Sequence, residues 1–314
     1  MKKLKKDSAD NKYQVAAFYC FSQLSEKEVS FLSRKLNSKA SEKNILGTII
    51  IALEGVNGTI CGYIEDVESL IKILRNHFSR IRIDVKYSYT RNQAFRRFKV
   101  KYKPEIVTMG SGKIDPNKQV GKYIKPNEWN KLLNDPNTLV IDTRNEYEVS
   151  IGTFPGALNP HTDNFRQFPS WVDNVLRPFI QRNPNKRIAM FCTGGIRCEK
   201  ATSFLIKQGF KDINHLEGGI LRYLEFVPEE ESLWEGECFV FDQRVALTHK
   251  LLPGDHHLCY ACGMPLNSQE RNSNNYIRGV QCEYCKGSFT EEDRSRFAER
   301  QKYYDNKALE GINS

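Results

Sequence analysis

The residues best suited to chemistry lie in the segment Cys192-Thr-Gly-Gly-Ile-Arg197, directly after a short apolar strand. Its glycines allow a tight loop whose backbone N–H groups point inward. A helix is expected from about Arg197, so its positive end and the Arg197 side chain both favour a thiolate over a thiol. Cys192 is therefore predicted to be a nucleophilic or redox-active cysteine, with Arg197 as its partner. The predicted loop consists of Thr193, Gly194, Gly195 and Ile196.

Four other cysteines form two pairs with C-x2-C spacing, namely Cys259, Cys262, Cys282 and Cys285. Two such pairs, here 19 residues apart, bring four thiolates together tetrahedrally, as in a structural Zn²⁺ site. Iron is the second interpretation and two disulfides are the third. The site is expected to be closed, because four cysteines already complete a tetrahedral shell.

The cysteine count also bears on the compartment. Nine cysteines, an odd number, occur in a chain of 314 residues whose basic N-terminus is not followed by an apolar core. We therefore expect reduced thiols in a cytoplasmic protein and a disordered basic tail over residues 1–12. No apolar run approaches the ~20 residues that span a bilayer.

Charge is concentrated in one segment. Between Lys86 and Lys125 there are eleven Lys or Arg residues against two acidic residues, and the rest of the chain sums to zero. Such a block indicates a polyanionic partner, most simply nucleic acid, and a solvated linker is the alternative interpretation.

Within this block, residues 98–103 alternate strictly between apolar and basic side chains, which predicts a strand with all its lysines on one face. A half-buried strand with a solvated lysine face explains the same alternation. If the strip follows a phosphate backbone, its nucleic-acid-binding residues are Arg91, Arg96, Arg97, Lys99, Lys101 and Lys103.

The elements around these sites divide the chain into α/β and α+β domains. Residues 13–90 alternate as β-α-β-β-α-β, the order of a ferredoxin-like sandwich, with a turn expected at Glu54–Gly58. A basic strand and linker follow over 91–125. Residues 126–228 alternate strands and helices, which predicts a parallel sheet with ligands beyond its carboxyl ends. Residues 229–314 are expected to be irregular around the cysteine pairs.

Residues 126–228 resemble the rhodanese family through three motifs in the family's order. These are Asp142-Thr-Arg144 followed by Glu146-Tyr147 and Gly152–Asn159, the loop Cys192-x-x-Gly195-x-Arg197, and His215-Leu-Glu-Gly-Gly219. The C-x4-R spacing is that of the sulfur-sized rhodanese loop, whereas cysteine phosphatases use C-x5-R. The resemblance makes Cys192 the sulfur-bearing residue, with Asp142 and Arg144 in support. Cys198 is a candidate resolving thiol, or a serine substitute that packs under the loop.

The whole chain, from about residue 13 to 290, resembles the TrhO/YceA family of rhodanese-domain proteins. The resemblance rests on Glu54-Gly-Val-Asn-Gly58, Lys103-Pro-Glu-Ile-Val-Thr-Met-Gly110, Met190–Lys200 and Trp234-x-Gly-Glu-Cys238-Phe-Val-Phe-Asp-x-Arg244-Val. It implies oxygen-dependent hydroxylation of the wobble uridine of tRNA to 5-hydroxyuridine. Molecular oxygen would then be a co-substrate and a reductant would be a partner. The sequence contains no two-histidine-one-carboxylate iron motif and no flavin or nicotinamide fingerprint.

Two alternatives remain open from the residues themselves. A persulfide sulfurtransferase acting on tRNA or another acceptor would use the same Cys192. A non-catalytic RNA-binding module with a vestigial rhodanese domain is the third hypothesis, and the intact Cys192 and Arg197 count against it.

Overall fold

The computed structural model describes residues 12–81, 83–112 and 114–312, which fall into two compact units. The first unit comprises the residues up to 243 together with 247–252, and the second comprises 244–246 and the residues from 253 onward. The expected basic tail lies outside the described residues except for Lys12. Within the described residues, every helix is too short or too polar to span a membrane.

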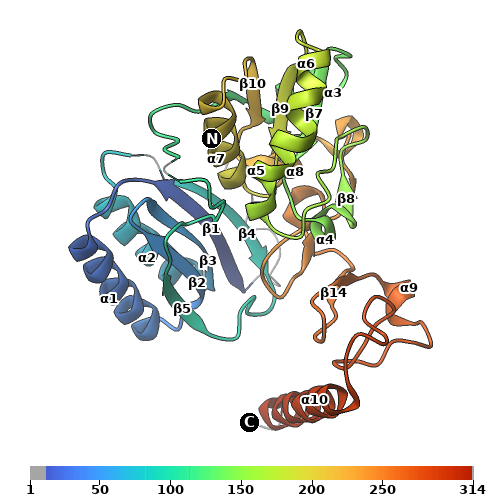
Figure 1. Cartoon of the computed structure of the whole chain (residues 1–314). Helices are drawn as coiled ribbons and strands as arrows, with labels where there is room; N and C mark the ends of the chain where they lie inside the picture. Colours follow the sequence, from blue (N-terminus) through green and yellow to red (C-terminus); the bar gives the residue numbers. More distant parts are fainter. Residues whose placement is uncertain (1–11, 82, 113, 313–314) are drawn as a thin grey trace. The chain divides into compact units, whose positions relative to one another are not determined.

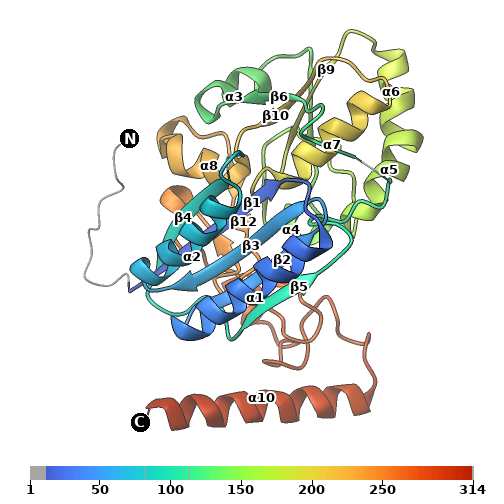
Figure 2. The same ribbon diagram turned by 90° about the vertical axis from the view of Figure 1, so that its left-hand side faces the viewer.

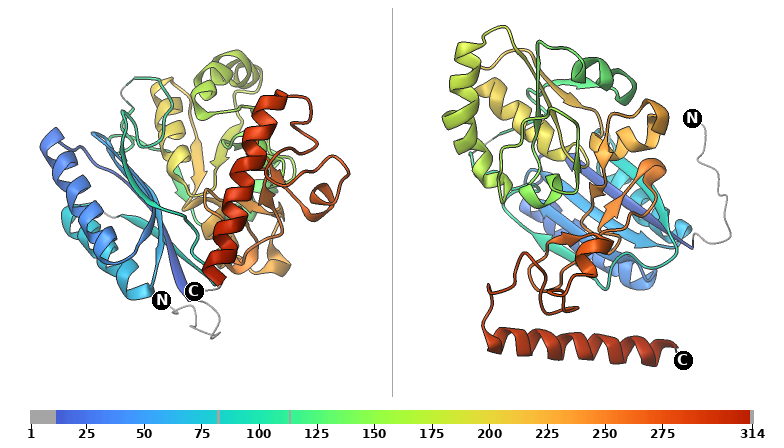
Figure 3. Two further views of the ribbon diagram at one scale, coloured as in Figure 1. Left: turned by 90° about the horizontal axis from the view of Figure 1, so that it is seen from below. Right: turned by 90° about the vertical axis from the view of Figure 1, so that its right-hand side faces the viewer.

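The N-terminal part has the β-α-β-β-α-β order of a ferredoxin-like sandwich, as predicted. Helices α1 and α2 lie side by side on one face of its sheet (Figures 1 and 3). β5 adds a fifth strand parallel to β2, so the strand order is β4-β1-β3-β2-β5. The elements are β1 (Tyr13–Phe21), α1 (Glu26–Glu42), β2 (Leu46–Ala52), β3 (Gly55–Gly62), α2 (Ile64–His77), β4 (Asp84–Thr90) and β5 (Phe98–Tyr102).

Alternation along the strands separates two faces of this sheet. In β1, Ala16 and Phe18 pack into the core beneath the two helices, whereas Tyr19 and Phe21 belong to a separate cluster with Ile106. In β5, Phe98 and Val100 pack against the helix-side core, which leaves the lysines between and after them on the opposite face. Tyr102 is the last residue of the strand, and 61% of it is exposed. The buried apolar face of β5 is therefore shorter than the alternation predicts.

The predicted turn at Glu54–Gly58 is wrong beyond Glu54, because β3 already begins at Gly55. The glycines serve close packing inside the sheet. A Cβ atom on Gly55, whose φ is +141°, would lie 2.0 Å from the carbonyl oxygen of Cys20. A Cβ atom on Gly58 would lie 2.9 Å from the carbonyl oxygen of Thr48, so neither position has room for a side chain.

The central part contains the predicted parallel sheet. Its strands are β6 (Lys122–Ile124), β7 (Thr138–Asp142), β9 (Arg187–Phe191) and β10 (Ile213–Leu216), in the order β6-β10-β9-β7. One apolar cluster contains Trp129, Tyr223 and Leu224, and a second contains Phe168 and Leu205. The helices are α3 (Pro126–Leu133), α4 (Glu146–Val149), α5 (Phe168–Trp171), α6 (Arg177–Arg182), α7 (Ile196–Lys207) and α8 (Gly219–Phe226).

Several short elements complete the part of the chain before residue 253. α8 begins at Gly219, and both Gly218 and Gly219 have positive φ. A π-helical turn at Val172–Leu176 joins α5 to α6. The remaining elements are β8 (Gly152–Thr153), which pairs with β11 (Glu235–Gly236), β12 (Cys238–Phe239), β13 (Ala246–Leu247), and 3-10 turns at Phe165–Gln167, Glu229–Glu231 and His249–Leu251.

The second unit carries the four cysteines and a long helix. It contains β14 (His257–Leu258) paired with β15 (Pro265–Leu266), α9 (Ser268–Arg271) and α10 (Glu291–Ile312). The expectation of irregular structure is wrong for α10, which Figure 2 shows as one continuous helix. The Thr290 hydroxyl accepts a hydrogen bond from the Asp293 amide, and acidic residues fill the first turn, so this helix starts at a favourable cap.

Neighbouring residues of α1 test the packing of the N-terminal core. Leu32 is fully buried, whereas Phe31 is 51% exposed. We expect Leu32→Ala to lower the free energy of unfolding by about 2–5 kcal/mol, because it leaves a cavity in a close-packed core. Phe31→Ala, the matched control, should change it by less than about 0.5 kcal/mol. Urea unfolding followed by circular dichroism measures both, and equal losses would contradict this core assignment.

Candidate active site

The reactive loop joins the carboxyl end of β9 to the start of α7. Gly195 is the residue before α7 and has φ +98°, which a residue with a side chain rarely adopts. This conformation turns the Gly195 amide toward the sulfur, and the amide donates a hydrogen bond of 3.1 Å to Cys192 Sγ. Cys192 is fully buried. Of the predicted loop residues, Gly195 contacts the sulfur through its amide, and Ile196 already belongs to the helix.

The environment of Cys192 favours the thiolate. Burial acts against the charge, but a hydrogen bond from the Cys198 thiol, the charge of Arg197 and the Gly195 amide outweigh it and lower the Cys192 pKa to about 5. Burial and the neighbouring thiolate raise the pKa of Cys198 well above its usual range. The pair is therefore a thiolate at Cys192 and a neutral, proton-donating thiol at Cys198.

Arg197 acts on the sulfur through its charge. Its guanidinium donates hydrogen bonds of 2.6 and 2.7 Å to the two carboxylate oxygens of Glu148, which is fully buried in α4. The Thr193 hydroxyl donates to the same carboxylate at 3.1 Å. Burial raises the pKa of Glu148, but the charge and hydrogen bonds of Arg197 have the larger, opposite effect. The pKa of Glu148 is therefore below its usual value, and the carboxylate is charged. Sequence reasoning missed Glu148, although it lies next to Glu146-Tyr147, a pair that carried the rhodanese resemblance.

Asp142 and Arg144 support this arrangement from behind the loop. They form a buried ion pair in which Arg144 Nη2 lies 2.6 Å from Asp142 Oδ2. The same guanidinium donates to the backbone oxygens of Glu148, at 3.1 Å, and Gly152, at 2.6 Å. The Thr153 hydroxyl donates a 3.0 Å hydrogen bond to Asp142. These contacts hold α4, and with it Glu148, in place.

The N-terminal sheet contributes side chains next to the loop that sequence reasoning did not select. The Tyr19 hydroxyl donates a 2.7 Å hydrogen bond to Glu199 in the first turn of α7. A Cβ atom on Gly195 would lie 3.0 Å from the same hydroxyl oxygen. Lys86 Nζ lies 5.0 Å from the centre of the Tyr19 ring and forms an ion pair with Asp84. The signal for these residues is weak, because Tyr19 and Glu199 are 180 positions apart in the sequence.

The predicted nucleic-acid-binding residues lie elsewhere on this sheet. Lys99 and Lys101 belong to β5, the edge strand opposite β4, and Lys103 follows its end. The segment before β5 carries the arginines, Arg91, Arg96 and Arg97. Lys99, Lys101 and Lys103 thus lie along the β5 edge with Arg96 and Arg97 close before it, whereas Arg91 directly follows β4, the opposite edge.

The four predicted metal ligands come together in the second unit. Their sulfur atoms all lie within 4.8 Å of one another, and this group could hold a metal ion. Cys259 Sγ lies 4.0 Å from Cys285 Sγ, and Cys262 Sγ lies 3.7 Å from Cys282 Sγ. Gly263 and Gly287 follow the two pairs with positive φ, which gives the tight turns that such knuckles need.

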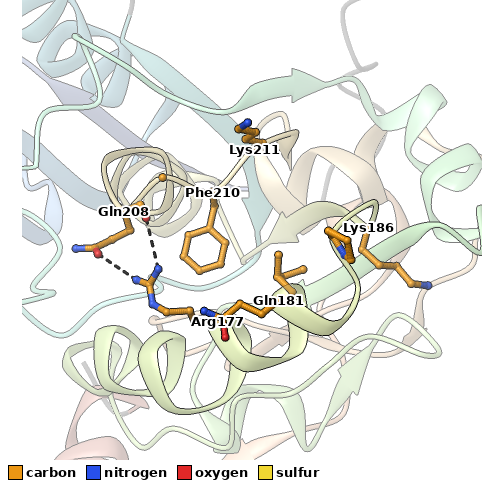
Figure 4. A pocket seen from close by; sticks show the side chains of 9 residues that line it. Arg177, Gln181, Lys186, Gln208, Phe210 and Lys211 are labelled. Carbon is orange, nitrogen blue, oxygen red and sulfur yellow. Dashed lines mark hydrogen bonds between the residues drawn. The ribbon is translucent and has the colours of Figure 1, made fainter.

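A surface pocket on the central part lies far from the sulfur. Arg177 lines the pocket and donates a hydrogen bond to Gln208 (Figure 4). The Arg177 guanidinium lies 5.0 Å from the centre of the Phe210 ring. Lys186, another lining residue, precedes β9, whereas Cys192 follows β9. Lys186 and Cys192 flank the five residues of the strand and are about 20 Å apart along it, so the pocket is not part of the reactive site.

The chain is similar to known proteins over most of its length. Residues 13–106 match the UPF0176 acylphosphatase like domain, and residues 125–225 match the Rhodanese-like domain. A tRNA uridine(34) hydroxylase of Prochlorococcus marinus (strain NATL2A) is 55% identical over 301 residues, which cover 94% of this chain and 92% of the relative. The chain belongs to the tRNA uridine(34) hydroxylase family. Another member, from Synechococcus sp. (strain CC9605), is 51% identical over 306 residues, covering 96% of this chain and 94% of the relative.

Three sequence motifs that suggested this family meet at one buried side chain. Lys200 Nζ lies 2.8 and 2.9 Å from the carboxylate oxygens of Glu54, 2.5 Å from Glu105 and 3.0 Å from the Val107 carbonyl oxygen. Glu54 also accepts a 2.7 Å hydrogen bond from the Ile106 amide. The helix that starts at the reactive loop is thereby fixed to the N-terminal sheet and to the segment after β5.

The lowered pKa of Cys192 can be measured directly. The ultraviolet absorbance of the thiolate should titrate with a midpoint of about 5, after subtraction of the Cys192→Ser spectrum. Cys198→Ala removes a hydrogen bond to the thiolate, so it should move the midpoint upward. Cys20→Ala is the control, because burial raises the pKa of Cys20 to about 12, and its removal should leave the midpoint unchanged. A midpoint near the ordinary value of 9.0 would refute the activation of Cys192.

Proposed function

We propose that this protein hydroxylates uridine 34 of tRNA to 5-hydroxyuridine and that Cys192 is its catalytic nucleophile. The observation that carries the proposal is the buried Cys192 sulfur, which accepts a hydrogen bond from the Gly195 amide, in a chain that belongs to the tRNA uridine(34) hydroxylase family. The basic residues along β5 support tRNA as the partner. The loop and the thiolate alone suit sulfur transfer equally well, so family membership decides between the two.

The chemistry of uracil gives Cys192 a specific role. Addition of a thiolate to C6 places the electron pair of the C5–C6 double bond on C5 and O4, which makes C5 the carbon that reacts with oxygen. Departure of the thiolate from C6, together with loss of the proton on C5 to a base, restores the C5–C6 double bond. Conversion of C5–H to C5–OH by molecular oxygen also uses two electrons and two protons and releases one water, so the reaction requires a reductant as a further partner.

The residues around the sulfur have distinct tasks in this proposal. Gly195 and Arg197 stabilise the thiolate before attack and after release. Cys198 keeps its proton and serves as hydrogen-bond donor, and it is also the thiol placed to resolve an oxidised Cys192. Glu148 and Arg144 are positioning residues, because they act on the sulfur only through Arg197 and the loop.

Nucleoside mass spectrometry of tRNA tests the proposal. A strain carrying Cys192→Ala should lose 5-hydroxyuridine, because the nucleophile is absent. The control is Cys238→Ala, which removes a buried thiol whose pKa burial raises to about 12. It should retain the nucleoside. If Cys192→Ala kept normal 5-hydroxyuridine and lost a thiolated nucleoside instead, sulfur transfer would replace hydroxylation as the function.

We also propose that the four-cysteine group holds a structural Zn²⁺. Four sulfur ligands with no place for water suit zinc in a closed tetrahedral site, and such a metal stabilises the fold rather than taking part in the reaction. Purified protein should contain about one zinc per chain by atomic absorption. Cys282→Ser should remove the metal and destabilise the second unit, whereas Cys61→Ser, outside the group, should retain it. Iron in place of zinc, or no metal at all, would contradict this assignment.

A further inference from the structure

The face of the N-terminal sheet that points away from α1 and α2 carries two neighbouring rows of side chains that cross all five strands. The pairing of the strands defines both rows from β5 to β4. One row is Lys99, Thr48, Thr59, Ala17 and Lys86, and the other is Lys101, Ile50, Asn57, Tyr19 and Asp84. With strands about 4.8 Å apart, these rows run for about 19 Å. We call them the sheet strip.

The sheet strip lies between two covered margins. On one side, Val15 and Cys61 are buried in a cluster with Ala94, from the segment before β5. On the other side, Phe21 and Ala52 are buried with Ile106, from the segment after β5. The five residues in the middle of the strip are only half-buried, namely Ala17, Thr48, Ile50, Asn57 and Thr59. The middle of the strip is thus partly exposed between these two clusters, and Asn57 Nδ2 there donates a 3.0 Å hydrogen bond to the Ile106 carbonyl oxygen.

The two ends of the sheet strip differ in their surroundings. At the β5 end, Lys99 and Lys101 form no ion pair within the described residues, and Arg97 and Lys101 repel the charge of Lys99. At the β4 end, Tyr19 and Lys86 are buried beside the loop that contains Cys192. Asp84 is the only acidic residue in the strip, and Lys86 and Arg222 both pair with it.

We propose that the sheet strip binds the single-stranded segment of tRNA that contains the target uridine and leads it from the β5 lysines to the Cys192 loop. Phosphates pair with Lys99 and Lys101, the hydroxyls of Thr48 and Thr59 hydrogen-bond along the middle, and the target nucleotide lies at the end of the strip, beside the buried Tyr19 and Lys86. A flat sheet face suits unpaired nucleotides, whose bases can spread over it. This inference rests on the proposed function, because it assigns a path for that substrate.

Charge changes in the middle of the strip test the path. Binding of an anticodon stem-loop RNA by the full chain is measured by fluorescence anisotropy over a series of salt concentrations. Thr59→Glu should weaken RNA binding about tenfold, whereas Thr59→Lys should strengthen it. Stronger binding by Thr59→Lys cannot result from misfolding of the variant. Lys101→Glu should weaken binding and reduce the salt dependence by about 0.7 in the log–log slope, as expected for one lost phosphate contact on a single strand.

The matched control is Lys35→Glu, which makes the same charge change on α1, on the other side of the same sheet. It should bind RNA like the unchanged protein. If Lys35→Glu and Lys101→Glu weaken binding equally, RNA binding responds to the net charge of the protein, and the proposed path along the sheet strip is refuted. If both Thr59 variants bind normally, the path is also refuted, while the proposed function stands as long as Cys192→Ala abolishes 5-hydroxyuridine. Loss of binding in the strip variants with 5-hydroxyuridine retained in Cys192→Ala would support the path and refute the catalytic proposal.

Discussion

The structure around the active site depends on keeping a negative charge on a fully buried sulfur. An unpaired charge inside a protein costs several kcal/mol, so each buried charge requires an opposite one within reach. The thiolate of Cys192 is balanced by Arg197, and Arg197 is balanced by Glu148. Behind Glu148 lies the ion pair of Arg144 and Asp142. Charges of alternating sign therefore extend from the sulfur into the centre of the domain.

The alternating charges are held at the carboxyl ends of two strands. Asp142 ends β7, and Cys192 follows the end of the neighbouring strand β9. The short helix α4 lies between them in the chain and brings its buried carboxylate under the loop. The parallel sheet supplies rigid positions at one edge, and the loops above it supply the charges. Removing any one of these charges would leave its neighbour buried without a partner.

Sequence reasoning found the parts of the site that are local in the chain. Cys192, Gly195 and Arg197 are neighbours, so the conformation of one loop brings them together. Glu148 and Tyr19 contribute through the tertiary fold, and no spacing rule connects residues 49 or 180 positions apart. The turn expected at Gly55–Gly58 failed for a related reason, because glycine fits tight turns and close backbone contacts equally well. The strand order of a ferredoxin-like sheet was predictable, whereas the addition of β5 depended on tertiary pairing.

The ion pairs of Lys200 have a consequence for how such a chain can change during evolution. Lys200, in the helix that follows the Cys192 loop, pairs with Glu54 and Glu105, which both lie outside the rhodanese domain. Excision of that domain would leave this lysine without its carboxylates and would uncover the side of the loop that Tyr19 contacts. Loss or exchange of either domain alone would therefore break these ion pairs and destabilise the remaining domain. The two domains are expected to be inherited as one piece, with their contact surfaces changing together.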